Sequence, residues 1–216
     1  PWTVVEAADA VEAERVLANL GRVPFDLTRA PLLRVTLVRI ADDDHVLHLL
    51  MHHIISDGWS SGLLLDDVAA LYEAFLDGAD ASQPPQVRYT DYAAWQRERL
   101  TGPAADADLT YWRDTLAHVP PLELPTDHPR PAQMRFRGAG TPFTLDRATT
   151  DALRALSTAH DATLYMTLLA GFAALLSRHS GAEDFAIGSP VAGRVDPAVE
   201  KVVGLFVNTL AIRTDL

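Results

Sequence analysis

The stretch MHHIISDGWSSGLLL, Met51 to Leu65, carries two overlapping catalytic patterns. Residues 52–58 read H-H-x-x-x-D-G, in which a histidine would do the chemistry. Residues 58–62 read G-x-S-x-G, the nucleophile-elbow pattern of hydrolases, in which Ser60 would be the nucleophile. The apolar patterns on either side place the stretch at a turn between a strand and a helix. Active residues gather at such turns, because the strand aims the side chain and the loop leaves room for a substrate.

Apolar spacing elsewhere predicts a mixture of helices and strands. Residues 7–20 and 63–76 repeat at helical spacing, and Ser60 or Ser61 would cap the second helix. Residues 32–40 and 45–53 alternate like an antiparallel hairpin. We expect further helices at 89–100, 109–116, 147–159 and 164–177, and further strands at 134–145, 184–189 and 205–214. The fold class is therefore α/β, or α+β with a mixed sheet.

One segment interrupts these patterns. Residues 120–131 hold five prolines and show no apolar period. Proline ends helices and strands, so this is the best candidate for a boundary in the chain. It separates residues 1–119 from residues 132–216.

The composition restricts the function classes. The chain has 216 residues, of which 48% are hydrophobic, and a formal net charge of −11. That charge argues against a nucleic-acid partner or an anionic membrane surface, and no apolar run is long enough to span a bilayer. There is no cysteine, which excludes thiolate metal sites and suits a reducing cytosol. We expect a cytoplasmic protein, and an opening Pro1 without a signal peptide suggests a piece of a longer one.

Strand alternation bears on the two histidines. If the strand runs to residue 53, His53 shares the face of Leu49 and Met51, and His52 points the other way. Such a pair cannot chelate one metal ion, and no cluster of ligands stands nearby, so we expect no metal site. The plain alternative for His53 is a hydrogen-bonded core histidine. The Asp57-Gly58 turn four residues later favours a catalytic role.

The serine reading has less support. Ser60 precedes a helix, and His118, His128, His160 and His179 are available as triad partners. However, several residues separate Ser60 from the strand, whereas a true elbow turns abruptly, and the chain has no HGGG-like oxyanion segment. A helix N-cap explains Ser60 without strain.

The nonamer HHIISDGWS resembles the signature of condensation domains of nonribosomal peptide synthetases. Other segments in chain order resemble further motifs of that family, and together they cover essentially the whole chain: PFDL at 24–27, PLLR at 31–34, YTDYAAW at 89–95, YW at 111–112, LPTDHPRP at 124–131, IGSPVAGR at 187–194 and GLFVNTL at 204–210.

The resemblance implies two chloramphenicol-acetyltransferase-like lobes, both incomplete here, so that the chain is an internal fragment. Residues 1–119 would belong to the N-terminal lobe with the histidine motif, residues 120–131 to the lobe crossover, and residues 132–216 to the C-terminal lobe. The motif would lie on the floor of the tunnel between the lobes. The wording S-D-G-W-S resembles the subtype that takes an L-configured donor and an L-configured acceptor.

The resemblance also implies a reaction and its partners. A donor acyl or peptidyl thioester would react with the α-amine of an acceptor aminoacyl thioester to form an amide. Both substrates would arrive on phosphopantetheine arms of upstream and downstream carrier domains, beside an adenylation domain, and no cofactor would be bound permanently. Much of the acceleration would come from holding the two arms together.

The resemblance assigns the site residues as follows. His53 would act as general base or by positioning the amine, and an imidazole that is largely neutral at physiological pH suits both roles. Asp57 would pair with an arginine, for which Arg194 is the candidate in this chain. The N–H of Gly58 would meet the oxyanion, and His52 would pack and hydrogen-bond. The candidates for lining the tunnel are Trp59, Ser60, Ser189 and Asn208.

Two alternatives remain at this point. One is a serine hydrolase that uses Ser60. The other is a non-catalytic binding relative that keeps the fold and turns nothing over.

Overall fold

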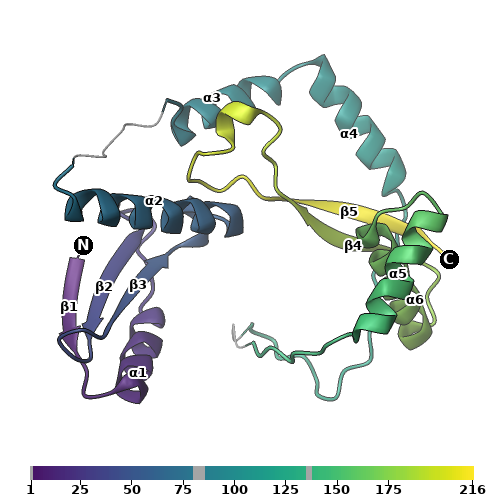
Figure 1. Cartoon of the computed structure of the whole chain (residues 1–216). Helices are drawn as coiled ribbons and strands as arrows, with labels where there is room; N and C mark the ends of the chain where they lie inside the picture. The colour runs from purple at the N-terminus through teal and green to yellow at the C-terminus, as the bar shows by residue number, and fades with distance from the viewer. Residues whose placement is uncertain (1, 80–85, 135–137) are drawn as a thin grey trace. The chain divides into compact units, whose positions relative to one another are not determined.

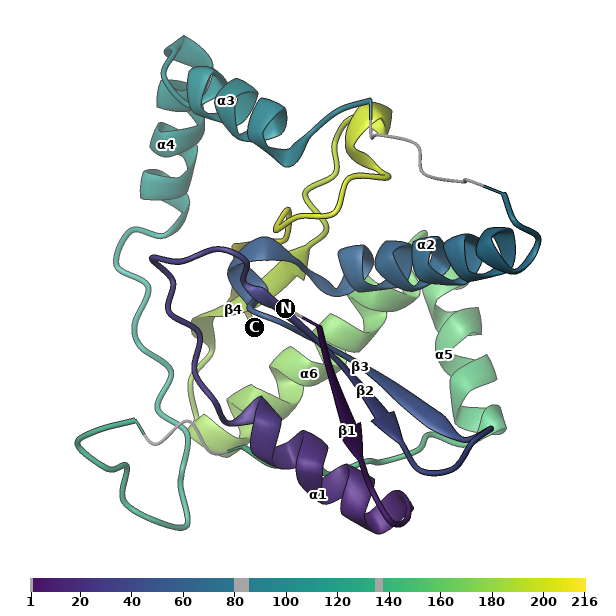
Figure 2. The ribbon, with the colours of Figure 1, turned by 90° about the vertical axis from the view of Figure 1, so that its left-hand side faces the viewer.

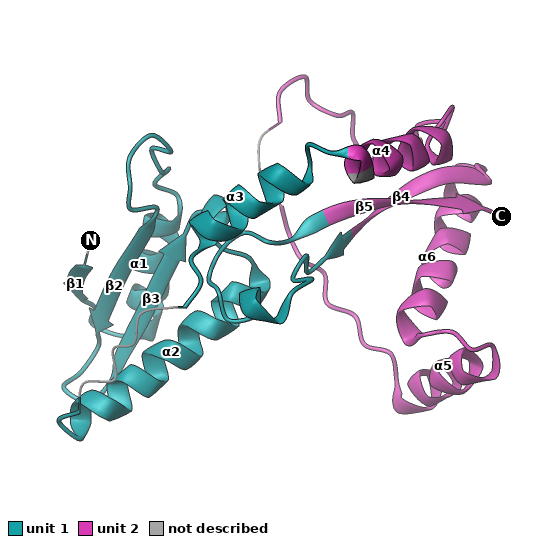
Figure 3. Cartoon of the chain, turned by 90° about the horizontal axis from the view of Figure 1, so that it is seen from above, with its two compact units in different colours: residues 1–102, 190–208 teal, residues 103–189, 209–216 magenta. Residues whose placement is uncertain are grey.

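The computed structural model of the chain describes residues 2–79, 86–134 and 138–216 (Figure 1). The described residues form two compact units. Unit 1 comprises residues 1–102 and 190–208, and unit 2 comprises residues 103–189 and 209–216 (Figure 3). The chain therefore returns to unit 1 for one short passage late in the sequence.

Unit 1 is built on a mixed three-stranded sheet of order β1-β2-β3. β1 (Trp2–Glu6) pairs parallel with β2 (Leu33–Arg39), and β2 pairs antiparallel with β3 (His45–Met51). The parallel pair requires a crossover, which helix α1 (Ala10–Gly21) supplies. Figure 2 shows the three strands side by side with α1 next to them. The mixed sheet confirms the predicted fold class.

A small apolar core fastens α1 to this sheet. Ala13 of α1 and Val38 of β2 are buried together, with Leu17 and Val46 packed against them. The helix begins at Asp9, whose carboxylate accepts a hydrogen bond from the backbone N–H of Glu12. Such a cap satisfies one of the free N–H groups of the first turn. The sequence predicted this helix and the β2–β3 hairpin, and both are confirmed; it did not predict β1.

The segment after β3 forms a short 3₁₀ turn and then a long helix. The turn, η1, covers His53–Ile55, and helix α2 covers Gly58–Leu76. Two expectations were wrong here. The strand ends at Met51, so strand alternation does not orient His53. The helix begins at Gly58 with Asp57 as its N-cap, not at residue 63 with Ser60 or Ser61 as the cap. The side chain of Asp57 provides the cap that local spacing assigned to the serines.

Unit 1 is completed by helix α3 (Tyr89–Arg99) and by the late passage of the chain. We call residues 192–207, between strands β4 and β5, the strap. The strap contains the 3₁₀ turn η2 (Pro197–Val199). Its Val199, Val202 and Phe206 form a buried cluster with Tyr92 of α3. The strap is thus packed into unit 1 although β4 and β5 lie mostly in unit 2.

The described residues of unit 2 form three helices and most of a two-stranded sheet: α4 (Pro103–Thr115), α5 (Arg147–Ala159), α6 (Leu164–Ser180), β4 (Asp184–Val191) and β5 (Asn208–Asp215). A hydrogen bond of 2.7 Å between the hydroxyls of Ser157 and Thr167 joins α5 to α6. Arg213 of β5 forms a two-pronged ion pair with Asp184 of β4, at 2.8 and 2.7 Å.

The expected strand at 134–145 is wrong over the residues that the structure describes, because Met134 and residues 138–145 are not in a strand. Residues 135–137 lie outside the described residues. The change between units falls at Gly102 and Pro103, and the described Pro-rich residues 120–131 lie within unit 2. The assignment of 1–119 and 132–216 to two lobes stays a prediction. None of the described helices is by itself long and apolar enough to cross a membrane; α5 and α6 meet that test only as a pair bent by 106°.

Candidate active site

The two histidines stand at the junction of β3 and α2. The backbone N–H of His52 still donates to the carbonyl of Leu32, at 3.0 Å, which extends the hairpin by one residue beyond β3. Nδ1 of His52 accepts a hydrogen bond from the N–H of Ile54, at 3.1 Å, and so caps the η1 turn. The ring also meets Phe25 edge-on, with 6.1 Å between centroids. A neutral His52 therefore carries its proton on Nε2, and its side chain shapes the turn that holds His53.

His53 is the first residue of η1, and its side chain is exposed. Within the described residues its imidazole has no hydrogen-bond or ion-pair partner. The turn beneath it is closed by the N–H of Ile55, which donates to the carbonyl of His52 at 3.0 Å. The alternative of a hydrogen-bonded core histidine does not hold in this structure. An exposed imidazole on a closed turn can accept a proton from a bound molecule or donate one to it.

Asp57 is buried and lies at the centre of a hydrogen-bond network. One carboxylate oxygen, Oδ1, accepts from the N–H of Ser60 at 2.8 Å, and the other, Oδ2, accepts from the N–H groups of Phe206 at 2.9 Å and Val207 at 3.2 Å. Burial raises the pKa of Asp57, but these N–H groups and the nearby charge of Arg194 outweigh it and lower the pKa to about 2. Asp57 is therefore an anion near neutral pH, and it ties the start of α2 to the strap.

Arg194 of the strap is the cation of this network. Its side chain is 2% exposed, and Nη2 lies 3.5 Å from Oδ1 of Asp57. Nη1 donates to the carbonyls of Val199 and Val202, the latter at 2.8 Å, and the guanidinium lies 4.0 Å from the ring centroid of Phe206. The structure thus brings together Asp57 and Arg194, the two residues proposed as a pair from the sequence. Arg194 therefore binds carbonyl groups within the strap and also contacts Asp57, the N-cap of α2.

Ser60 is completely buried in the first turn of α2. Its hydroxyl donates to the carbonyl of Gly204 at 2.7 Å and accepts from the N–H of Gly204 at 3.0 Å and from Nη2 of Arg194 at 2.9 Å. A hydroxyl has one proton and two lone pairs, and all are used. No histidine of the described residues bonds it. Ser60 is therefore neither an accessible nucleophile nor an open wall of a tunnel in this structure.

Gly58 and Trp59 complete the first turn of α2. Gly58 is exposed at the first helical position, where backbone N–H groups have no partner within the helix and the helix dipole favours negative charge. Trp59 is 52% exposed, and its indole Nε1–H donates to the carbonyl of Glu200 in the strap at 3.1 Å. The motif therefore contacts the strap through Asp57, Trp59 and Ser60.

The last two candidates lie elsewhere. Ser189 is buried in β4 of unit 2, and its hydroxyl shares a hydrogen bond with the hydroxyl of Tyr165. Asn208 is exposed at the start of β5, directly after Val207, whose N–H binds Asp57. Asp57, Trp59, Ser60 and Arg194 lie together in unit 1, to which Asn208 also belongs, whereas Ser189 belongs to unit 2.

The strap supplies partners that sequence reasoning did not single out. Both backbone groups of Gly204 bind Ser60, and a Cβ at Gly204 would overlap the ring of Tyr89. At Gly193 the φ angle is +67°, and a Cβ would overlap the carbonyl of Phe206. The late segments IGSPVAGR and GLFVNTL contain these glycines, but no spacing rule connects them with residues 57–60.

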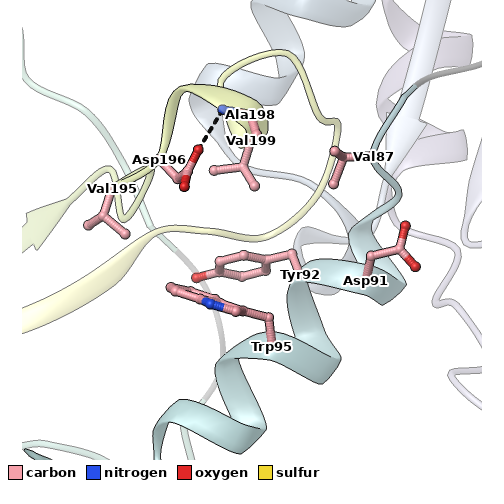
Figure 4. Close-up of a pocket in the computed structure, with 8 residues that line it drawn as sticks. All are labelled: Val87, Asp91, Tyr92, Trp95, Val195, Asp196, Ala198 and Val199. Atoms are coloured by element: carbon pink, nitrogen blue, oxygen red, sulfur yellow. Dashed lines mark hydrogen bonds between the residues drawn. The ribbon is translucent and has the colours of Figure 1, made fainter.

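A cavity of about 170 Å³ opens between the strap and α3 (Figure 4). The described residues that line it are Val87, Asp91, Tyr92, Trp95, Val195, Asp196, Ala198 and Val199. The rings of Tyr92 and Trp95 lie together there, with 5.8 Å between centroids. None of the site residues expected from the sequence is in this lining. Among the described residues, no group of three or more histidine, aspartate or glutamate side chains is arranged to hold a metal ion.

Comparison with known proteins places this chain in a family. The chain is 48% identical over 196 residues to malpibaldin synthetase of Mortierella alpina and 45% identical over 216 residues to chondramide synthase cmdD of Chondromyces crocatus. The matches cover 90% and 98% of this chain, but the chain spans only 4% and 5% of the length of these relatives.

Two solved structures are similar to this chain along its whole length. A four-domain nonribosomal peptide synthetase, holo-AB3403 bound to AMP and glycine, matches with a TM-score of 0.86 and 30% identity, over 100% of this chain and 16% of its own. The X-domain from teicoplanin biosynthesis, solved in complex with OxyB, matches with a TM-score of 0.92 and 28% identity, over 100% of this chain and 49% of its own. The family model described as "Condensation domain" matches residues 2–216, which confirms the resemblance carried by HHIISDGWS. The chain belongs to the condensation-domain family.

Proposed function

We propose that this chain contributes the histidine-motif part of a condensation domain that forms an amide between two carrier-bound substrates. The donor is an acyl or peptidyl thioester, and the acceptor is the α-amine of an aminoacyl thioester. The amine nitrogen attacks the thioester carbonyl, a C–N bond forms, the C–S bond breaks, and the thiol stays on the donor arm. Family membership supports this reaction class, and the names of the relatives, a synthetase and a synthase, and of a structural neighbour, a nonribosomal peptide synthetase, agree with it.

The observation that carries the proposal is the exposed imidazole of His53, presented on a turn that is held at both ends. His52 caps the turn on one side, and Asp57 anchors its exit to the strap on the other. In the reaction His53 accepts the proton that the attacking amine loses, or holds the amine by a hydrogen bond. The N–H of Gly58, at the start of α2, supplies a donor for the oxygen of the tetrahedral intermediate.

The partners follow from the same proposal. Upstream and downstream carrier domains deliver the substrates on phosphopantetheine arms, an adjacent adenylation domain loads the acceptor, and no cofactor stays in the site. The subtype is the one that joins an L-configured donor to an L-configured acceptor. Trp59 and Asn208, both exposed, are the side chains available as tunnel lining among the residues expected from the sequence.

The experiment uses the full-length protein with donor and acceptor carriers loaded, and follows the condensed thioester by mass spectrometry. His53→Ala should lower the rate of amide formation about a hundred- to ten-thousandfold, the usual worth of acid–base help. His45→Ala is the matched control, since His45 is exposed at the opposite end of β3. Wild-type turnover in the His53→Ala variant would refute the assignment.

The two alternatives give different outcomes. A serine hydrolase should be labelled at Ser60 by a fluorophosphonate probe, whereas the buried and fully bonded hydroxyl should not react. A non-catalytic relative should form no amide with any loaded carrier, even in the wild type.

A further inference from the structure

Three residues of the motif hold the strap, and they do so in different ways. Asp57 and Ser60 are buried and bind the backbone of residues 204–207. Trp59 binds the carbonyl of Glu200 through its indole N–H, while about half of its surface stays open. Trp59 is therefore the member of this group that can contact the strap and a bound molecule at once.

The bond from Trp59 reaches a turn that is already closed by other contacts. Around η2, the carboxylate of Asp196 accepts from the N–H of Ala198 at 2.8 Å, and the N–H of Glu200 donates to the carbonyl of Pro197 at 3.2 Å. Arg194 also donates to the carbonyl of Val199. The turn can therefore fold without the indole, and the indole N–H adds a bond that joins this turn to α2.

The same bond restrains the indole. A tryptophan side chain on a helix surface otherwise moves among rotamers, and a hydrogen bond at the far end of the ring removes that freedom. The guanidinium of Arg194, 5.7 Å from the ring centroid, lies on one side of it. A rigid, half-open aromatic surface is thus fixed one residue after Gly58 and six residues after His53.

We infer that Trp59 is a positioning residue of the condensation reaction: its indole, fixed by the Glu200 carbonyl, forms a rigid wall against which the acyl thioester is oriented for attack. The inference rests on the proposed function and adds a determinant that the histidine chemistry does not contain. Orientation of this kind acts on the rate of the bound complex more than on binding, because it changes how often the reacting atoms meet in the right geometry.

The test compares Trp59→Phe, which keeps an aromatic ring and removes the N–H, with Trp59→Ala, which removes both. The measured quantities are kcat and the KM for the acceptor in amide formation by the full-length protein. Trp59→Phe should lower kcat about three- to tenfold, the range that one neutral hydrogen bond is worth, and leave KM within about twofold. Trp59→Ala should lower kcat further. Trp95→Phe is the matched control, since it also removes the indole N–H of a partly exposed tryptophan in unit 1.

A readout independent of turnover separates this inference from the proposed function. Hydrogen exchange of the strap peptide around residues 196–201 should become faster in Trp59→Phe and stay unchanged in Trp95→Phe. If the wild type forms no amide, the proposed function fails, whatever the exchange shows. If the wild type is active and Trp59→Phe has the wild-type kcat, the inference is overturned. A rise in KM without a change in kcat would also overturn it, because Trp59 would then only bind.

Discussion

Nη2 of Arg194 lies 3.5 Å from Oδ1 of Asp57, although the two residues are 137 positions apart in the chain. Both side chains are almost fully buried. The carboxylate makes its shorter bonds to backbone N–H groups, at 2.8 and 2.9 Å, so the ion pair is only one part of its environment. A buried carboxylate needs hydrogen-bond partners, and the N–H groups of Ser60, Phe206 and Val207 supply them to Asp57 from two distant stretches of sequence. Among the described residues, Nε of Arg194 is buried without such a partner.

Acid should weaken this network within a defined pH range. The pKa of Asp57 in the folded state is about 2, below its ordinary value of 3.8. The ionised carboxylate therefore stabilises the fold above about pH 4, and its contribution is lost as the pH falls from about 4 to 2. The complete domain should lose about 2 kcal/mol of unfolding free energy over that range because of this group, and Asp57→Asn should not. Urea unfolding at a series of pH values measures it, with Asp43→Asn, on the exposed β2–β3 turn, as the control. Equal slopes for wild type and Asp57→Asn would contradict the prediction.

Removing the Ser60 hydroxyl should destabilise unit 1. Ser60→Ala leaves the buried N–H and C=O of Gly204 and Nη2 of Arg194 without this partner. We expect a loss of about 1–3 kcal/mol, the cost of leaving buried polar groups unpaired. Ser61→Ala is the neighbouring control, because the Ser61 hydroxyl only donates to the carbonyl of Asp57 in its own helix, at 3.1 Å. Urea unfolding of the complete domain compares the two variants, and a loss of equal size in both would show that the Gly204 contacts add nothing.

Adding one methyl group should have opposite effects at two glycines of unit 1. In Gly204→Ala the new Cβ meets the ring of Tyr89 and should cost about 1–3 kcal/mol by overpacking. In Gly62→Ala the Cβ lies on α2 and meets no atom within 4 Å beyond its chain neighbours and the backbone of its own helix, and the change should stabilise the helix by about 0.5–1 kcal/mol. Melting curves of the two variants would decide. A Gly204→Ala variant as stable as the wild type would mean that Tyr89 moves aside freely.

The 216-residue chain expressed alone should self-associate. Helix α2 exposes Tyr72, Phe75 and Leu76 by 66–70%, and α6 exposes Tyr165, Met166 and Leu175 by 51–56%. Clusters of exposed apolar side chains on soluble proteins promote association. Light scattering coupled to size-exclusion chromatography measures the mass of the species in solution. A monodisperse monomer that melts cooperatively would show this prediction to be wrong.

Local patterns accounted for a large part of the fold. Helical spacing located α1, α3, α5 and α6 to within a few residues, and alternation located β2 and β3, the latter with two residues too many at its end. These elements can be predicted from the sequence because the apolar period of each one is detectable within a single short segment. The strand expected at 134–145 was wrong over the described residues. The strand β1 was missed, because it has only five residues and its parallel partner β2 lies beyond a helix in the sequence.

By itself, the sequence determined the family and the motif, because HHIISDGWS is a contiguous signature that needs no fold to be read. Only the tertiary structure decided what Ser60, Trp59 and Asp57 do. Their partners lie in the strap, which shows no apolar period, and backbone groups such as the N–H of Phe206 and the carbonyl of Gly204 have no side-chain identity to detect. Such long-range hydrogen bonds form only because the folded chain brings the strap back to the start of α2. In the tertiary structure Ser60, which the sequence offered as a nucleophile, is buried and binds the strap, whereas the imidazole of His53 is exposed.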